Sequence, residues 1–167
     1  VHALAVEGTF DDCQALVKSM FNDAAFRRDT ALSGVNSINW ARIMAQIVYY
    51  FTAAASLGAP ARKISFTVPT GNFGDIFAGY AAKRMGLPID RLVIATNAND
   101  ILARTLADGV YETLGVHPTT SPSMDIQVSS NFERLLFEAS GRDAALVTRL
   151  MQSLSQSGRF TLPDGVL

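Results

Sequence analysis

The stretch SFTVPTGNFGD, residues 65–75, decides the fold of this chain. Residues 66–68 are apolar and β-favouring, and Pro69 has no NH to donate, so a strand is predicted to end at the proline. Gly71 and Gly74 then allow a tight turn. Apolar residues after Gly74 recur at helical spacing. The stretch therefore predicts a buried strand, a glycine loop and a helix in direct succession.

The predicted loop has the properties of an anion-binding site. NH groups of such a loop converge on the first turn of the helix, where the helix dipole is positive. The glycines stand three apart and no Lys-Ser or Lys-Thr pair follows, which excludes a dinucleotide fingerprint and a P-loop. A single phosphate monoester is the ligand that remains. The alternative interpretation is that TGNFGD is only a turn and a helix cap.

Four blocks of sequence together carry a resemblance to a known family. They are VEGTFDDCQALVK from Val6, NSINWARIMAQIVYYF from Asn36, TGNFGDIFAGYAAKRMGLPIDRLVIATNANDIL from Thr70 and SPSMDIQVSSNFERLLFE from Ser121. Over nearly its whole length the chain resembles threonine synthase, a pyridoxal-phosphate enzyme of the type II, tryptophan-synthase-like fold. The resemblance implies that the loop at 70–75 binds the cofactor's phosphate. The residues it assigns are Gly71, Asn72, Phe73, Gly74 and Asp75.

The resemblance also implies an activity for the parent enzyme. It would convert O-phospho-L-homoserine and water into L-threonine and phosphate, as a cytoplasmic lyase of amino-acid biosynthesis. Two other interpretations stay open. The chain could be a segment of another type II enzyme such as a serine or threonine dehydratase, or a noncatalytic phosphate-binding α/β module.

The lysines indicate that the chain is one α/β segment of a larger enzyme, truncated at both ends. Pyridoxal-phosphate enzymes need a Schiff-base lysine, and the chain holds only Lys18, Lys63 and Lys83, none suitably placed. The family resemblance implies that this lysine lies upstream and the partner of the pyridine nitrogen downstream. We therefore expect no catalytic residue in this chain, no activity from it in isolation, and self-association through unpaired strand edges.

Composition excludes several other classes of function. The 167 residues are 49% hydrophobic and 17% charged, with a formal net charge of −1 and scattered arginines, which argues against nucleic-acid binding. No apolar run is long enough to span a membrane. The single cysteine, Cys13, is expected to be an inert core thiol. His2 and His117 have no metal-ligand spacing, so no metal site is expected.

Alternation of strand and helix patterns predicts the fold class. The expected class is α/β, with a three-layer, open, mainly parallel sheet and helices on both faces. Strands are expected at residues 1–6, 64–68 and 92–96, and helices at residues 9–22, 37–57, 74–85, 100–108, 131–139 and 144–156. Residues 23–34 are expected to form a mixed loop, and residues 111–123 a long loop with a functional role.

Weaker candidates for the site are polar residues beside the predicted elements. Asn36 and Asn39 precede the long helix, where they either cap it or form a wall of the active site. The group Asn97, Asn99 and Asp100 follows the third strand at its carboxyl end, which is the ligand side of a parallel sheet, but an Asx turn and a cap for the helix at Asp100 are the favoured explanation.

Two further candidates have simple structural explanations. Asp11 and Asp12 form a pair of carboxylates, but acidic residues in a first helical turn also suit the helix dipole. His117 lies in the long loop and is expected to be exposed.

Overall fold

The computed structural model describes residues 2–166. Its helices are α1 (Phe10–Asn22), α2 (Ala24–Thr30), α3 (Trp40–Ser56), α4 (Gly74–Arg84), α5 (Ile101–Asp108), α6 (Phe132–Ala139) and α7 (Ala144–Ser157), with a 3₁₀ turn at Pro122–Met124. Its strands are β1 (Ile64–Pro69), β2 (Ile89–Ala95), β3 (Val110–Glu112) and β4 (Arg159–Thr161). The predicted α/β class is confirmed.

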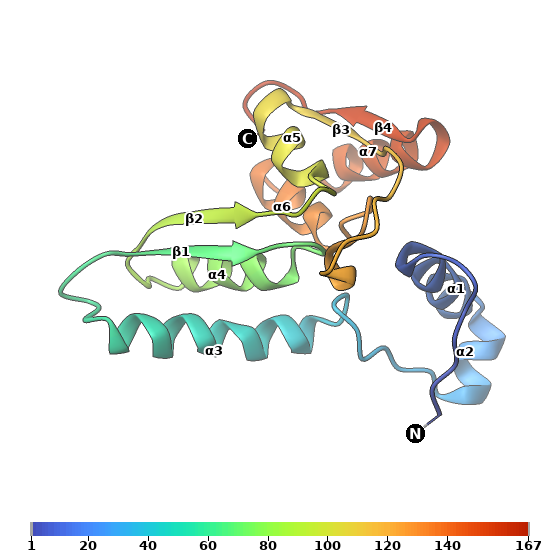
Figure 1. Ribbon diagram of the computed structural model, residues 1–167, viewed down its shortest axis with the longest axis horizontal. Coiled ribbons are helices and arrows are strands. Elements are labelled where there is room, and N and C mark those ends of the chain that lie inside the picture. The colour runs from blue at the N-terminus through green and yellow to red at the C-terminus, as the bar shows by residue number, and fades with distance from the viewer. Residues whose placement is uncertain (1, 167) are drawn as a thin grey trace.

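A parallel pair of strands with two long helices forms the elongated part of the molecule (Figure 1). Strands β1 and β2 pair in parallel, with Phe66 opposite Leu92 and Val68 opposite Ile94. In Figure 1, α3 and α4 lie on the same side of this pair. The described residues thus form a parallel pair and a separate antiparallel pair, where the sequence pattern had predicted one open sheet with helices on both faces.

Helices α3 and α4 pack closely because α4 carries a glycine at the contact. A Cβ on Gly79 would lie 2.6 Å from Cε1 of Tyr50, so only glycine fits beside this ring. The Tyr50 ring also meets Phe66 of β1 edge to face, with 4.9 Å between centroids. Ile43 and Ala54 of α3 are almost completely buried. This packing fixes α4, and hence the loop that precedes it.

An antiparallel pair and three helices form the second part of the molecule (Figure 1). Strand β3 pairs with β4, and the Tyr111 ring stacks on Phe160 at 4.9 Å and on Phe132 at 5.6 Å. Neither short strand was predicted, because three residues are too few to show a period. Tertiary pairing between residues about fifty positions apart creates them.

The N-terminal helices lie to one side of the rest (Figure 1). Thr9 and Asp12 form a capping box at the start of α1. The strand predicted at 1–6 is wrong: residues 2–6 form no strand, having no partner to pair with, and Val1 is outside the described residues. The mixed loop predicted at 23–34 is also wrong for residues 24–30, since Asp23 caps α2 through the NH groups of its first turn.

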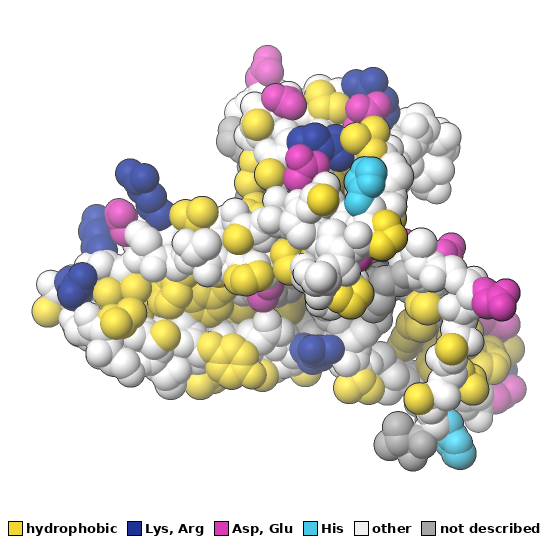
Figure 2. Space-filling model, viewed as in Figure 1, with side chains coloured by type: hydrophobic (Ala, Val, Ile, Leu, Met, Phe, Trp, Pro, Cys, Tyr) yellow, Lys and Arg dark blue, Asp and Glu magenta, His cyan; other side chains and the backbone are white. Residues whose placement is uncertain are grey.

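Two apolar residues of α1, Cys13 and Leu16, lie outside the core. Leu16 is 51% exposed and Cys13 is only half-buried, so the expectation of a core thiol is wrong. Gln14, a polar residue, is the buried one. Apolar side chains also extend along α3 and the edge of β1 at the surface, as Figure 2 shows. They include Trp40, Met44, Val48 and Tyr49.

Candidate functional site

The predicted strand, glycine loop and helix are confirmed as β1, the loop 70–73 and α4. The NH of Thr70 donates to the carbonyl of Ala95 at 2.8 Å, which continues the parallel ladder to the edge of the loop. Phe73 adopts a left-handed conformation with φ 65°, uncommon for a non-glycine residue. Its buried ring meets Phe132 edge to face at 5.4 Å. This packing holds the loop against α6.

The donor groups of this loop are free. Within residues 2–166, the backbone NH groups of residues 71–74 donate to no other group of the chain. Four successive NH groups at the start of an eleven-residue helix lie at the positive end of its dipole. NH groups in this position can bind an acceptor ligand such as an anion.

Several acceptor groups of the same loop are bonded to the protein. Ser129 donates through Oγ to the carbonyl of Gly71 at 2.8 Å. Asn131 donates to the carbonyl of Asn72 twice, through its backbone NH at 3.1 Å and Nδ2 at 3.0 Å. The side-chain oxygen of Asn72 accepts from Nε2 of Gln14 at 3.2 Å and from Oγ of Ser130 at 3.1 Å. The loop is therefore held from its carbonyl side.

Close contacts disfavour a side chain at both loop glycines, whereas the turn itself does not require glycine there, since neither has a positive φ. A Cβ on Gly71 would lie 3.2 Å from Cα of Met124 and 3.3 Å from the carbonyl oxygen of Ser123. A Cβ on Gly74 would lie 3.3 Å from Nδ2 of Asn131. These neighbours are backbone or fully buried, so they cannot move aside easily.

Asp75 is the second residue of α4, and it lines a space other than the donor side of the loop. With Tyr50 and Phe66 it faces a groove of about 260 Å³ between α3 and β1. Burial raises the pKa of the Asp75 carboxyl, while hydrogen bonds from the NH groups of Ile76 and of Asp75 itself oppose the shift. The Tyr50 hydroxyl donates to the carbonyl of Asp75 at 2.8 Å and so ties α3 to the first turn of α4.

Asn36 and Asn39 have local capping roles beside the loop. Asn39 caps α3, with Oδ1 accepting from the NH of Ala41 at 2.9 Å, and Oδ1 of Asn36 accepts from the NH of Ile38 at 3.2 Å. The turn at residues 36–39 nevertheless lies close to the glycine loop. The carbonyl of Ser37, between them, accepts from Nδ2 of Asn131, the same group that contacts the loop.

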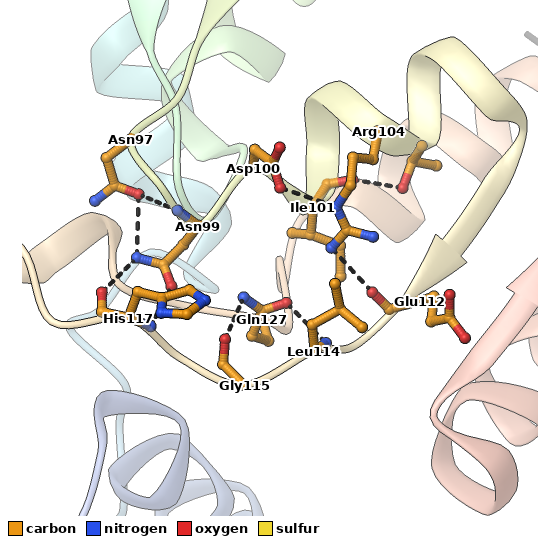
Figure 3. A network of polar contacts seen from close by, with 11 residues as sticks. Asn97, Asn99, Asp100, Ile101, Arg104, Glu112, Leu114, Gly115, His117 and Gln127 are labelled. Atoms are coloured by element: carbon orange, nitrogen blue, oxygen red, sulfur yellow. Dashed lines mark hydrogen bonds and ion pairs between the residues drawn. The ribbon is translucent and has the colours of Figure 1, made fainter.

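Residues after β2 form a closed polar network (Figure 3). Asn97 makes the expected Asx turn, accepting from the NH of Asn99 at 2.8 Å. Asn99 bonds through its side chain to both the carbonyl and the NH of His117, each at 2.8 Å. Asp125 accepts from both amides and from Thr119, and these hydrogen bonds, Thr119 first, lower its pKa. The network fixes the long loop that the sequence predicts.

Asp100 is not the side-chain cap expected of it. It pairs instead with Arg104 one turn later, at 2.8 Å (Figure 3). The imidazole of His117 is on an exposed residue, as expected.

The two aspartates of α1 differ in role. Asp12 completes the capping box, and hydrogen bonds from Thr9 lower its pKa. Asp11 accepts from the NH of Gln127 at 3.1 Å, and burial raises its pKa. Asp11 thus anchors α1 to the segment that precedes α6, a role its position in the sequence does not indicate.

The three lysines are all on exposed residues. Nζ of Lys83 donates to the carbonyl of Asp90, and Lys18 lines a small cavity beside Ser129 and Ser130. Within residues 2–166 no group of three His, Cys, Asp or Glu could hold a metal ion. No helix in the same range is long and apolar enough to cross a membrane.

Sequence reasoning missed four residues that contact the loop from its carbonyl side. They are Gln14, Ser129, Ser130 and Asn131. In the sequence, Ser and Asn before a helix look like ordinary caps, and Gln14 lies among apolar residues. Their contacts with the loop span 58 or 59 positions, so no local signal could have found them.

The known proteins that resemble this chain in sequence and in structure are threonine synthases. No family model matches the chain. It is 57% identical over 164 residues to threonine synthase from Pseudomonas aeruginosa, covering 98% of this chain and 35% of that protein. The crystal structure of pyridoxal-phosphate-bound threonine synthase from Brucella melitensis is 73% identical, with a TM-score of 0.88 over 99% of this chain and 36% of that one.

A yeast threonine synthase structure is 48% identical, with a TM-score of 0.80 over 98% of this chain and 34% of that one. The chain thus spans about a third of the length of the relatives it matches. These similarities do not favour a dehydratase segment or a free-standing binding module. Over the residues it spans, the chain belongs to the threonine synthase family.

Proposed function

We propose that this chain is part of an enzyme that converts O-phospho-L-homoserine and water into L-threonine and phosphate, with pyridoxal phosphate as cofactor. In this proposal the loop at 70–75 binds the cofactor's phosphate. Support comes from the Brucella melitensis relative, which binds pyridoxal phosphate, and from the threonine synthases that this chain resembles. The substrate of this activity, O-phospho-L-homoserine, is a small phosphorylated amino acid.

The observation that carries the proposal is the free donor side of the loop. Four NH groups at residues 71–74 have no partner in the described chain, while the carbonyls of Gly71 and Asn72 are bonded to Ser129 and Asn131. Three or four hydrogen bonds to a charged phosphate are worth about 1.5–3 kcal/mol each before ordering costs. Such a site needs no nearby Lys or Arg. The donors present therefore fit a phosphate group.

The loop residues have distinct roles in this proposal. Gly71 and Gly74 let the backbone approach the phosphate, Asn72 and Phe73 contribute NH groups, and Asp75 continues the chain into α4. Asp75 lines the groove beside Tyr50, and burial disfavours the charge of its carboxyl by raising its pKa. When bound, pyridoxal phosphate supplies an electron sink that stabilises carbanions. This chain's contribution is to fix the position of the ring through the phosphate.

The lysine that the cofactor needs is proposed to come from a part of the enzyme other than these 167 residues. Lys18, Lys63 and Lys83 are all exposed, on α1, before β1 and on α4 respectively. We also propose a cytoplasmic location, with which a single cysteine and hence no internal disulfide is consistent. Nucleic acid and membranes are not proposed as partners, and self-association through unpaired strand edges remains a prediction.

The test is to compare the full-length protein that carries this segment with the 167-residue chain alone. With pyridoxal phosphate and O-phospho-L-homoserine, the full-length protein is expected to release threonine and phosphate in equal amounts, and the isolated chain neither. Release of ammonia and a keto acid from serine or threonine instead would favour a dehydratase. Threonine formation by the isolated chain would contradict the assignment of catalysis to residues outside it.

A further inference from the structure

The segment of residues 129–131, just before α6, bonds to two carbonyls of the glycine loop. Ser129 bonds to the carbonyl of Gly71, and Asn131 to that of Asn72. Ser130 accounts for one of the bonds to the side-chain oxygen of Asn72. One short segment therefore bonds to the acceptors of Gly71 and Asn72, and it contacts none of the loop's free NH groups.

The geometry of the peptide bond makes these contacts directional. In a trans peptide the C=O and the following N–H point in opposite directions. Fixing the carbonyl of Gly71 on Ser129 therefore turns the NH of Asn72 away from that segment. Fixing the carbonyl of Asn72 on Asn131 does the same to the NH of Phe73. Without these bonds the two peptide planes could rotate, and the donors would no longer converge.

Asn131 has no capacity left for a ligand of its own. It is completely buried, and Nδ2 donates to the carbonyls of Asn72 and Ser37, each at 3.0 Å. Its Oδ1 accepts from Nε of Arg134 at 2.9 Å, and Arg134 in turn donates to the carbonyl of Ile38. Both NH groups of Nδ2, and Oδ1, therefore bond within the protein. Any effect of the Asn131 side chain on a ligand must act through the loop.

We propose that Ser129 and Asn131 are positioning residues that orient the NH groups of the glycine loop toward a phosphate monoester, and that Asn131 also sets the 36–39 turn against the same loop. The inference rests on the proposed phosphate-binding role of residues 70–75. It predicts that removing the donors of Ser129 or Asn131 weakens binding of the phosphate group while leaving the rest of the cofactor's contacts unchanged.

The experiment measures the affinity of the full-length protein for pyridoxal phosphate and for pyridoxal, which lacks the phosphate. The ratio of the two affinities reports the loop alone. N131D keeps the shape and the acceptor for Arg134 but replaces the Nδ2 donor, and is expected to reduce the ratio by roughly tenfold or more. S129A, a smaller change, is expected to reduce it about threefold. The ³¹P resonance of the bound cofactor should shift in both.

A variant on the same helix separates positioning from stability. Leu136 is fully buried in α6 but does not bond to the loop, so L136A should lower the melting temperature and leave the ratio unchanged. If N131D does not fold, S129A carries the test. Wild-type ratios in both folded variants would overturn the positioning role. If the wild type itself showed no preference for pyridoxal phosphate over pyridoxal, the proposed function of the loop would fail first.

Discussion

Two loops follow the two parallel strands at the same end of the sheet, and they treat their polar groups in opposite ways. After β1, the NH groups of residues 71–74 have no partner in the described chain, although the carbonyls beside them are bonded. After β2, Asn97 and Asn99 bond to Asp125, Thr119 and each other. One loop presents donors, and the other is saturated.

This difference separates a binding loop from a structural one. Polar side chains at the carboxyl end of a parallel strand mark both loops as ligand candidates. Only the hydrogen-bond partners distinguish them, because a group that is already satisfied gains little from a ligand. Asn99 is 5% exposed and fully engaged, so the loop after β2 supports the fold and not the ligand.

The largest effect is expected from Gly71→Val. Its side chain would contact the backbone of Met124 and Ser123, displacing the loop and its donors. Loss of two charge-assisted bonds predicts an affinity for pyridoxal phosphate reduced by about 100-fold in the full-length protein. Phe73→Leu leaves every NH in place and should be milder. Equal affinities for Gly71→Val and wild type, measured by absorbance titration, would show that the loop is only a turn.

Asn99→Ala should lower the stability of the protein without changing its affinity for pyridoxal phosphate. It removes the two part-buried bonds to the backbone NH and carbonyl of His117, at a cost of about 1–3 kcal/mol in the free energy of unfolding. Pyridoxal-phosphate affinity of the folded protein should not change. Asn22→Ala, on an exposed residue, is the control and should stay within about 0.5 kcal/mol of wild type. A loss of affinity in Asn99→Ala would assign the second loop to the site.

The smallest effects are expected in the pH dependence, where the two regions should differ in sign. Burial raises the folded-state pKa of Asp75, so its favourable contribution is present below the unfolded value of 3.8 and is lost as pH rises through the raised pKa. Hydrogen bonds lower the pKa of Asp125, so its contribution is present above 3.8 and is lost as pH falls through the lowered pKa.

Urea titrations between about pH 3 and pH 7 would measure how the free energy of unfolding depends on each of these two carboxyls. Asp75→Asn should lessen the decline of stability above the ordinary aspartate pKa. Asp125→Asn should be less stable than wild type at neutral pH, since its NH₂ group would face the donors of Asn97, Asn99 and Thr119. The same slope for both variants would show that the two carboxyls are not in the environments described.

Much of the fold could be predicted from local sequence. The strand at 64–69 and the helices from α3 onward lie where periodicity, caps and glycines indicate them. The strand expected at 1–6 failed because alternation of residue type cannot show that a partner strand is present. Strands β3 and β4 could not be predicted, because three residues are too few to show an alternating pattern. They form only because the two segments pair with each other.

The sequence by itself determined that a glycine loop follows a strand and opens a helix, since proline, glycine and helical spacing act over a few residues. Tertiary structure alone decided that the NH side of this loop is free. That outcome depends on Ser129 and Asn131 reaching its carbonyls from 58 or 59 positions away. Sequence patterns report local conformation, whereas hydrogen-bond satisfaction depends on which distant groups packing brings together.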